Sequence, residues 1–307
     1  MSLTQEQRNY WLQILKDTGG HRETMLKEAE IPAEYLDFSD RVERHEITLA
    51  LPNVTVPVRV IISAAMDREE NCPVHVNLHG GGFVFPQNQD DDMYCARVAV
   101  GIGGVVVDVD YALSPDHPFP TAFEQCYEVT RWTFSKCEGW KADANRISIG
   151  GQSAGGALAA AVAMRSAASG DFRLCLQVLS YAALDFATPF GNKPGSRGTP
   201  EAMLKRSDAL NALYLNGDTN LAQMPFVSPA MATDNMLKGL PEALFLTGGK
   251  CPFRFEDEML ARRMAAQGVT VTVKHYLESR HGFVVRRLDQ WQDAQAFIVC
   301  VIRRAGL

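Results

Sequence analysis

The sequence predicts an α/β protein built on a mostly parallel sheet with helices on both faces. Two observations predict this class. From about residue 73 onward, short apolar runs typical of strands alternate with segments that have helical spacing. Some of these runs contain consecutive β-branched residues, as in the three valines at 105–107, and such fully apolar strands are expected where both faces of a sheet are covered.

The N-terminal region predicts a helical segment over residues 4–36. Apolar residues recur there at helical spacing, and the pattern is interrupted at Gly19, Gly20 and Pro32.

Two strands are expected next, at about 42–51 and 54–62. They are joined at Pro52 and Asn53, and so short a connection forces an antiparallel pair. Pro57 lies inside the second run, and a proline has no N–H to give to a sheet. The second run is therefore expected to be an edge strand.

The rest of the sheet is expected to come from six further strands separated by helices. The strands are predicted near 73–78, 104–110, 146–150, 174–181, 242–247 and 270–276. The helices are predicted near 90–101, 120–137, 154–168, 256–267 and 289–304. The sheet then has eight strands, and with no repeat or long linker the chain is expected to form one domain over residues 1–307.

A long insertion separates two of the predicted strands. Residues 184–240 are rich in Gly, Pro and Asn and have short helical pieces near 199–215. An insertion of this size at the ends of strands usually covers a binding site.

Composition excludes several function classes. The net charge of −6 gives no reason to expect nucleic acid or an anionic membrane as partner. No apolar run approaches the roughly 18 residues that a membrane-spanning helix needs, and the polar residues 1–13 contain no signal-peptide core. Seven cysteines without a C-x-x-C pair indicate reduced thiols in a cytoplasmic protein rather than disulfides or a zinc site.

Ser153 is the candidate nucleophile. It lies in G-Q-S-A-G at 151–155, which fits G-x-S-x-G, the tight turn that presents a serine between a strand and a helix. An apolar strand precedes it and an alanine-rich helix follows, as this turn requires. A serine that merely caps a helix would match the pattern too, but the paired motif described next favours catalysis.

Gly81, Gly82 and Ala154 are the candidate oxyanion hole. The motif H-G-G-G at 79–82 closes an apolar strand and fits the loop whose backbone N–H groups bind a developing oxyanion. A flexible glycine loop is the simpler alternative. Together with the serine turn, the loop indicates a serine hydrolase.

His281 is the candidate general base. It follows the last predicted strand and precedes the last helix. In hydrolases with such a sheet, the catalytic residues occur along the chain in the order serine, acid, histidine, and His281 fits the last of these positions.

Four motifs together resemble the hormone-sensitive-lipase branch of the α/β-hydrolase esterases, also called bacterial family IV. They are H-G-G-G-F at 79–83, D-Y-A-L-S-P-D-H-P-F-P at 110–120, G-Q-S-A-G-G at 151–156 and H-G-F at 281–283. The resemblance implies an α/β-hydrolase fold with a helical cap. In this chain the cap is expected to consist of residues from about 1–40 and 184–240. The resemblance also implies a carboxylesterase that needs no cofactor or metal, acts on small esters with short acyl chains, and forms homodimers in some members.

The chain departs from this family at the third catalytic residue. The family pattern D-P-L-R-D-E is replaced by C-P-F-R-F-E at 251–256, so Cys251 stands where the aspartate is expected. A second departure is Gln152, where the family usually has an acidic residue before the serine.

The departure leaves three alternatives open. Another carboxylate, Glu256 or Asp185, takes the role of the acid. Alternatively Cys251 itself contacts His281 as a thiol or thiolate, with help from Lys250. In the third case the acid is missing, and the chain is a slow esterase or a non-catalytic small-molecule-binding protein on the same fold. A thioesterase or amidase with the same machinery stays open as well.

Candidate pocket and structural residues complete the prediction. The acyl pocket candidates, each of which could instead be core, are Phe83, Phe85, Phe190, Met203, Leu204 and Phe226. Asp108 and Asp110, at the end of an apolar strand, are expected to form structural hydrogen bonds.

Overall fold

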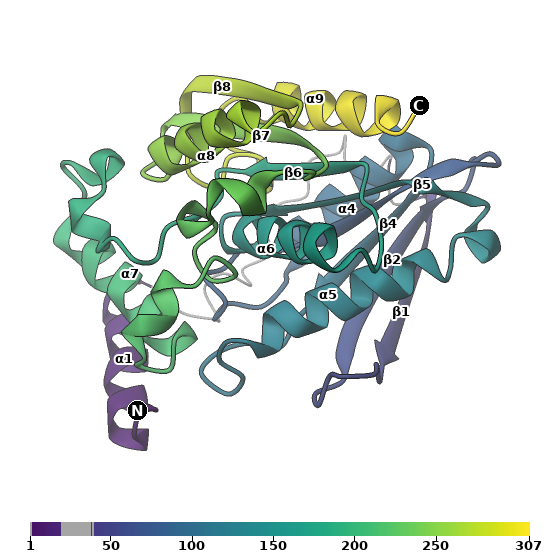
Figure 1. Cartoon of the computed structure of the whole chain (residues 1–307). Coiled ribbons are helices and arrows are strands. Elements are labelled where there is room, and N and C mark those ends of the chain that lie inside the picture. Colours follow the sequence, from purple (N-terminus) through teal and green to yellow (C-terminus); the bar gives the residue numbers. More distant parts are fainter. Residues whose placement is uncertain (1, 20–37, 39) are drawn as a thin grey trace.

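The computed structural model describes residues 2–19, 38 and 40–307, and it places an eight-stranded sheet at the centre of the molecule (Figure 1). The strand order is β1-β2-β4-β3-β5-β6-β7-β8. The strands are β1 (Val42–Leu49), β2 (Val58–Ala65), β3 (Cys72–Leu78), β4 (Val105–Asp110), β5 (Ala142–Gln152), β6 (Leu176–Ser180), β7 (Glu242–Lys250) and β8 (Val271–Arg280). From β4 to β8 all neighbours are parallel. The predicted α/β class and strand number are confirmed.

The first two strands are antiparallel, as predicted, but their connection is longer than expected. Leu49 pairs with Val58, so residues 50–57 form the loop. Pro57 therefore precedes β2 instead of lying inside it. β2 also pairs with β4, so β1 and not β2 lies at this edge of the sheet, and the prediction from Pro57 was wrong. The physical reason is that a proline just outside the ladder costs no sheet hydrogen bond.

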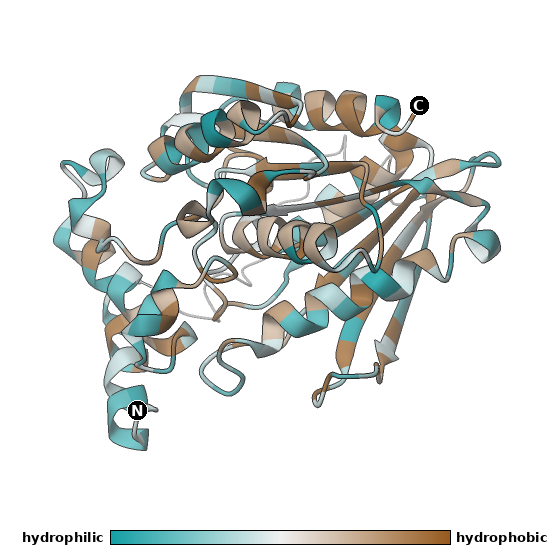
Figure 2. Ribbon diagram, viewed as in Figure 1, coloured by the Kyte–Doolittle hydropathy of each residue, from teal (hydrophilic) through white to brown (hydrophobic). Residues whose placement is uncertain are grey.

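Helices cover both faces of the sheet. One face carries α5 (Thr121–Phe134), α6 (Ala154–Ser169) and α8 (Arg254–Ala266), whose buried side chains belong to one apolar cluster. The other face carries α4 (Gln89–Ile102) and α9 (Trp291–Arg304), which pack on each other in a second cluster. Figure 2 shows apolar residues along the central strands, as expected for strands that have helices packed on both faces.

Two helices lie apart from the sheet, on the left of Figure 1. They are α1 (Gln5–Asp17) and α7 (Glu201–Tyr214), which pack together through Leu15, Ala209 and Leu213. The same small cluster includes Val84 and Phe85, which follow the glycine loop. The rest of the predicted N-terminal segment, residues 20–36, lies outside the described residues. In the part of the chain that the structure describes, no helix is long and apolar enough to cross a membrane.

Candidate active site

Ser153 stands on the turn that joins β5 to α6. Its backbone has φ 55° and ψ −115°, a conformation that few side-chain-bearing residues adopt and that marks a constrained, functional turn. The turn also brings α6 close to β3: a Cβ on Gly155 would lie 1.9 Å from the carbonyl oxygen of Leu78. Only glycine fits there, which explains the second glycine of the motif.

His281 directly follows β8, and its ring lies against the serine. Nε2 of His281 is 3.0 Å from Oγ of Ser153. Burial lowers the pKa of His281 to about 3, and the positive charge of Arg286 adds to this shift. The imidazole is therefore neutral at neutral pH, which is the state in which a ring nitrogen can accept the serine proton.

Cys251 directly follows β7 and occupies the position behind the imidazole. Its sulfur is 3.2 Å from Nδ1 of His281, and the residue is 4% exposed. Burial raises the pKa of the Cys251 thiol, although the backbone N–H groups of Phe253 and Arg254 act on the same sulfur in the opposite direction. The thiol therefore stays protonated at neutral pH.

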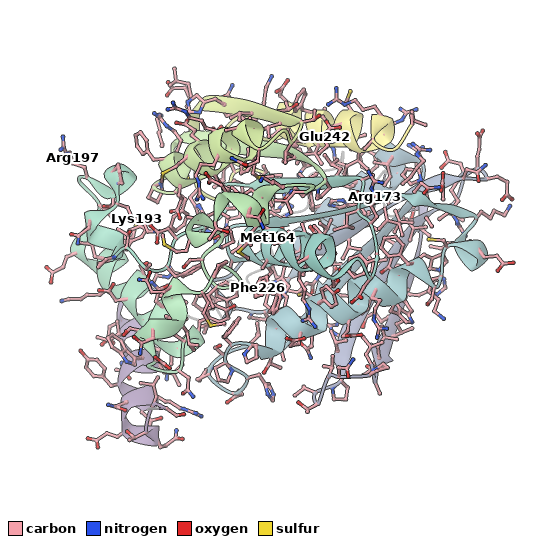
Figure 3. All side chains as sticks on the ribbon, viewed as in Figure 1. Met164, Arg173, Lys193, Arg197, Phe226 and Glu242 are labelled. Carbon is pink, nitrogen blue, oxygen red and sulfur yellow. The ribbon has the colours of Figure 1, made fainter. Side chains whose placement is uncertain are left out.

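Glu256 does not contact His281 among the described residues, contrary to the expectation that it could be the acid. Its Oε2 accepts the N–H of Leu184 at 2.8 Å, and its Oε1 pairs with Nζ of Lys193 at 2.8 Å. Nδ1 of the imidazole already faces Cys251. The longer side chain is used instead to bind a buried lysine, which Figure 3 labels on the segment before α7.

Asp185 is a turn residue, contrary to the expectation that it could be the acid. Its Oδ1 accepts the N–H groups of Ala187 and Thr188, both at 2.9 Å. Asp110 pairs with Arg59 at 2.7 Å, which agrees with the structural role expected for it.

The glycine loop and the start of α6 border the same cavity as Ser153. Within the described residues, no hydrogen bond uses the backbone N–H of Gly81, Gly82 or Ala154, so these donors are available to a ligand. Gly81 has φ 108°, and a Cβ there would lie 2.7 Å from the carbonyl oxygen of Phe85. A side chain at this position would therefore disturb the loop.

His79 and Tyr111 hold the loop in place. Their rings stack at 4.1 Å, and the Tyr111 hydroxyl donates to the carbonyl oxygen of His79 at 2.8 Å. Burial lowers the pKa of His79 to about 4, so this ring is neutral and serves structure.

Gln152 connects the serine turn to the sheet behind it. Its amide donates to Oδ1 of Asn77 at 3.0 Å, and Asn77 donates to Oδ1 of Asp108 at 2.6 Å. Burial raises the pKa of Asp108 to about 7. The hydrogen bond from Asn77 confirms Asp108 as a structural hydrogen-bonding residue. Among the residues that the structure describes, the hydrogen bonds of His281 go to Ser153 and Cys251, and none of them involves Gln152.

The cavity over Ser153 has a volume of about 240 Å³. Of the candidate pocket residues, Phe85, Phe190 and Met203 line it. Phe83, Leu204 and Phe226 do not; Phe83 stacks on Tyr214, and Phe226, labelled in Figure 3, stacks on Phe123 at 5.2 Å.

One face of α7 supplies cavity residues that the sequence did not single out. Besides Met203, these are Arg206, Ser207, Leu210 and Asn211. Their spacing of three and four residues is that of one helix face, which could have been found once α7 was known to face the site. In the described part of the chain, no three His, Cys, Asp or Glu side chains come together to hold a metal ion.

A sequence profile for the alpha/beta hydrolase fold matches residues 75–285. Among curated proteins, esterase LipI of Mycobacterium tuberculosis is 30% identical over 244 residues, which are 79% of this chain and 76% of that protein. Carboxylesterase NlhH of the same species is 30% identical over 265 residues, covering 84% and 80%. Human hormone-sensitive lipase is 38% identical over 95 residues, which are 31% of this chain and 9% of that protein.

Two solved structures with the same architecture are named as esterases. A hyperthermophilic esterase from the archaeon Pyrobaculum calidifontis superimposes with a TM-score of 0.79 and 28% identity, covering 99% of this chain and 98% of that one. Carboxyl esterase 2 of the fungus Tuber melanosporum superimposes with a TM-score of 0.76 and 26% identity, covering 87% and 88%.

Proposed function

The chain belongs to the alpha/beta hydrolase superfamily, in its hormone-sensitive-lipase-like branch of carboxylesterases, and we propose that it hydrolyses small, short-acyl esters through an acyl-enzyme on Ser153. The observation that carries the proposal is the 3.0 Å distance between Nε2 of His281 and Oγ of Ser153. A serine hydroxyl is a weak nucleophile unless a base within hydrogen-bonding reach removes its proton. The neutral imidazole is such a base.

The reaction follows from this arrangement. Oγ of Ser153 attacks the ester carbonyl carbon while Nε2 of His281 takes the hydroxyl proton. The backbone N–H groups of Gly81, Gly82 and Ala154 bind the oxygen that becomes negative. When the tetrahedral intermediate collapses, the alcohol oxygen takes the proton from His281 and leaves the acyl group on Ser153. Water then repeats both steps and releases the acid.

Cys251 makes this a slow enzyme. A carboxylate only accepts hydrogen bonds, so it fixes the proton of the imidazole on Nδ1 and stabilises the imidazolium that forms. A neutral thiol at 3.2 Å can donate as well as accept, and it brings no charge. When it donates to Nδ1, the imidazole carries its proton on Nε2 and cannot accept from Ser153. This observation favours impaired catalysis over the full rate of an esterase with an acid.

The cap elements expected at about 1–40 and 184–240 complete the proposal. One face of α7 borders the cavity, which supports a cap role for residues 184–240. α1 packs on α7, which supports a cap role for the N-terminal residues. The cavity that α7 borders has a volume of about 240 Å³, which favours short acyl chains.

The experiment that tests the function is hydrolysis of p-nitrophenyl butyrate by the purified protein, with Ser153→Ala as the blank. Turnover above this blank and labelling of the wild type by a fluorophosphonate probe are expected. Turnover equal to the blank together with no labelling would contradict the proposal and favour a binding protein.

A further inference from the structure

Two arginines from different parts of the chain border the cavity over Ser153. Arg206 lies on the cavity face of α7, and Arg286 lies in the turn that follows His281. The stem of Arg286 passes over Gly282, where a Cβ would lie 3.2 Å from its Cδ. Its guanidinium is thus close to the imidazole, and its charge lowers the pKa of both His281 and Arg206.

Neither guanidinium is neutralised. Within the described residues, Arg206 and Arg286 form no ion pair and no hydrogen bond, and the guanidinium of Arg206 lies 5.4 Å from the centroid of the Phe85 ring. The neighbouring Arg287, by contrast, pairs with Asp90 at 3.0 Å. Arg206 is half-buried and Arg286 is exposed, and the charge of Arg286 lowers the pKa of Arg206, so the two positive charges repel each other. An anion bound by both would relieve this repulsion.

The carboxylates that also border the cavity do not supply this anion. Asp90 is the partner of Arg287. Asp91 is 5% exposed and accepts the N–H of Asn88 at 3.0 Å, and burial raises its pKa well above the usual range, which disfavours its charged form. Among the described residues, neither carboxylate is therefore paired with Arg206 or Arg286.

We propose that Arg206 and Arg286 bind a carboxylate of the substrate, so that the enzyme acts on acylated hydroxy acids, esters whose alcohol half carries a carboxylate. The guanidinium fork matches a carboxylate and holds it in one orientation. The alcohol half is assigned because His281, next to Arg286, returns the proton to the alcohol oxygen. The bound carboxylate also offsets the charge of Arg286, which otherwise disfavours the imidazolium. This substrate class rests on the proposed function.

The test compares p-acetoxybenzoate with its neutral analogue p-acetoxybenzamide. For the wild type, kcat/KM is expected to be at least about tenfold higher for the anion, since hydrogen bonds to charged groups contribute this much or more. Arg206→Gln and Arg286→Gln should each lower the ratio of anionic to neutral kcat/KM by roughly 10- to 100-fold. Arg197→Gln is the matched control: Arg197 is exposed and points outward in Figure 3, and its exchange should leave both substrates unchanged.

The outcomes separate this inference from the proposed function. If both esters are hydrolysed through Ser153 with equal kcat/KM, and the arginine variants keep that ratio, the carboxylate site is wrong while the esterase stands. If neither ester is hydrolysed above the Ser153→Ala blank, the esterase is wrong. In that case calorimetric titration of p-acetoxybenzoate into the wild type still tests the site: binding that Arg286→Gln weakens tenfold supports it, and no binding overturns it.

Discussion

The sulfur of Cys251 lies 3.2 Å from Nδ1 of His281, in the position from which a carboxylate would orient the imidazole. The backbone N–H groups of Phe253 and Arg254 lower the pKa of the Cys251 thiol, but burial is the larger effect and raises it. The site is thus arranged for an acid but contains a neutral thiol.

Cys251→Asp should raise kcat. A carboxylate fixes the imidazole proton on Nδ1 and stabilises the imidazolium, effects worth roughly 10⁴-fold in a serine protease. We expect a gain of about 10²- to 10⁴-fold, measured as kcat for p-nitrophenyl butyrate. The exposed Cys300 offers the matched control, since Cys300→Asp introduces the same charge on the surface. An unchanged kcat in Cys251→Asp, with a loss in Cys251→Ala, would mean that the thiol already performs this role.

Glu256→Gln should destabilise the protein and leave its chemistry largely intact. The side chains of Glu256 and Lys193 are 7% and 8% exposed, so removing one charge leaves the other buried and unpaired. We expect the free energy of unfolding to fall by about 3 kcal/mol. Urea denaturation measures this, and Lys193→Met in a double-mutant cycle gives the coupling energy. A fall in kcat by orders of magnitude at unchanged stability would instead identify Glu256 as the acid.

The pH dependence of kcat/KM should show that His281 stays neutral well below about pH 6. The imidazole must be neutral to accept the serine proton, so kcat/KM falls only when the pH drops through the pKa of His281, which burial lowers to about 3. We expect kcat/KM to be level between about pH 7 and 5, with circular dichroism to confirm that the protein stays folded. In Cys251→Asp the carboxylate favours the imidazolium, so the acid limb should move upward. A wild-type limb near the ordinary histidine pKa would contradict this.

Gly155→Ala should abolish activity by disrupting the serine turn. Its Cβ would lie 1.9 Å from the carbonyl oxygen of Leu78, and neither backbone can yield without moving α6 or β3. We expect a loss of about 3 kcal/mol or more in the free energy of unfolding. Gly139→Ala is the matched control, because a Cβ there meets nothing within 4 Å. It should change stability by less than about 0.5 kcal/mol. Equal stability of the two variants would refute the packing argument.

The sequence by itself determined the class of fold, the eight strands and the serine and glycine motifs. These features are local: a G-x-S-x-G turn or an apolar strand is written in consecutive residues, and its backbone requirements restrict the side chains there. For the same reason the sequence located Cys251 at the position of the acid, since Pro252 and Arg254 fix the register of the motif.

Only the tertiary structure decided which side chains meet. Glu256 and Cys251 are five residues apart in the same motif, and nothing local tells which of them faces His281. The fold turns Cys251 toward the imidazole and Glu256 toward Lys193, 63 residues away in the chain. The same holds for Arg206, which became a cavity residue because α7 packs over the glycine loop. Contacts between distant segments depend on how whole elements pack, and that packing is set by the sum of many weak interactions rather than by any one motif.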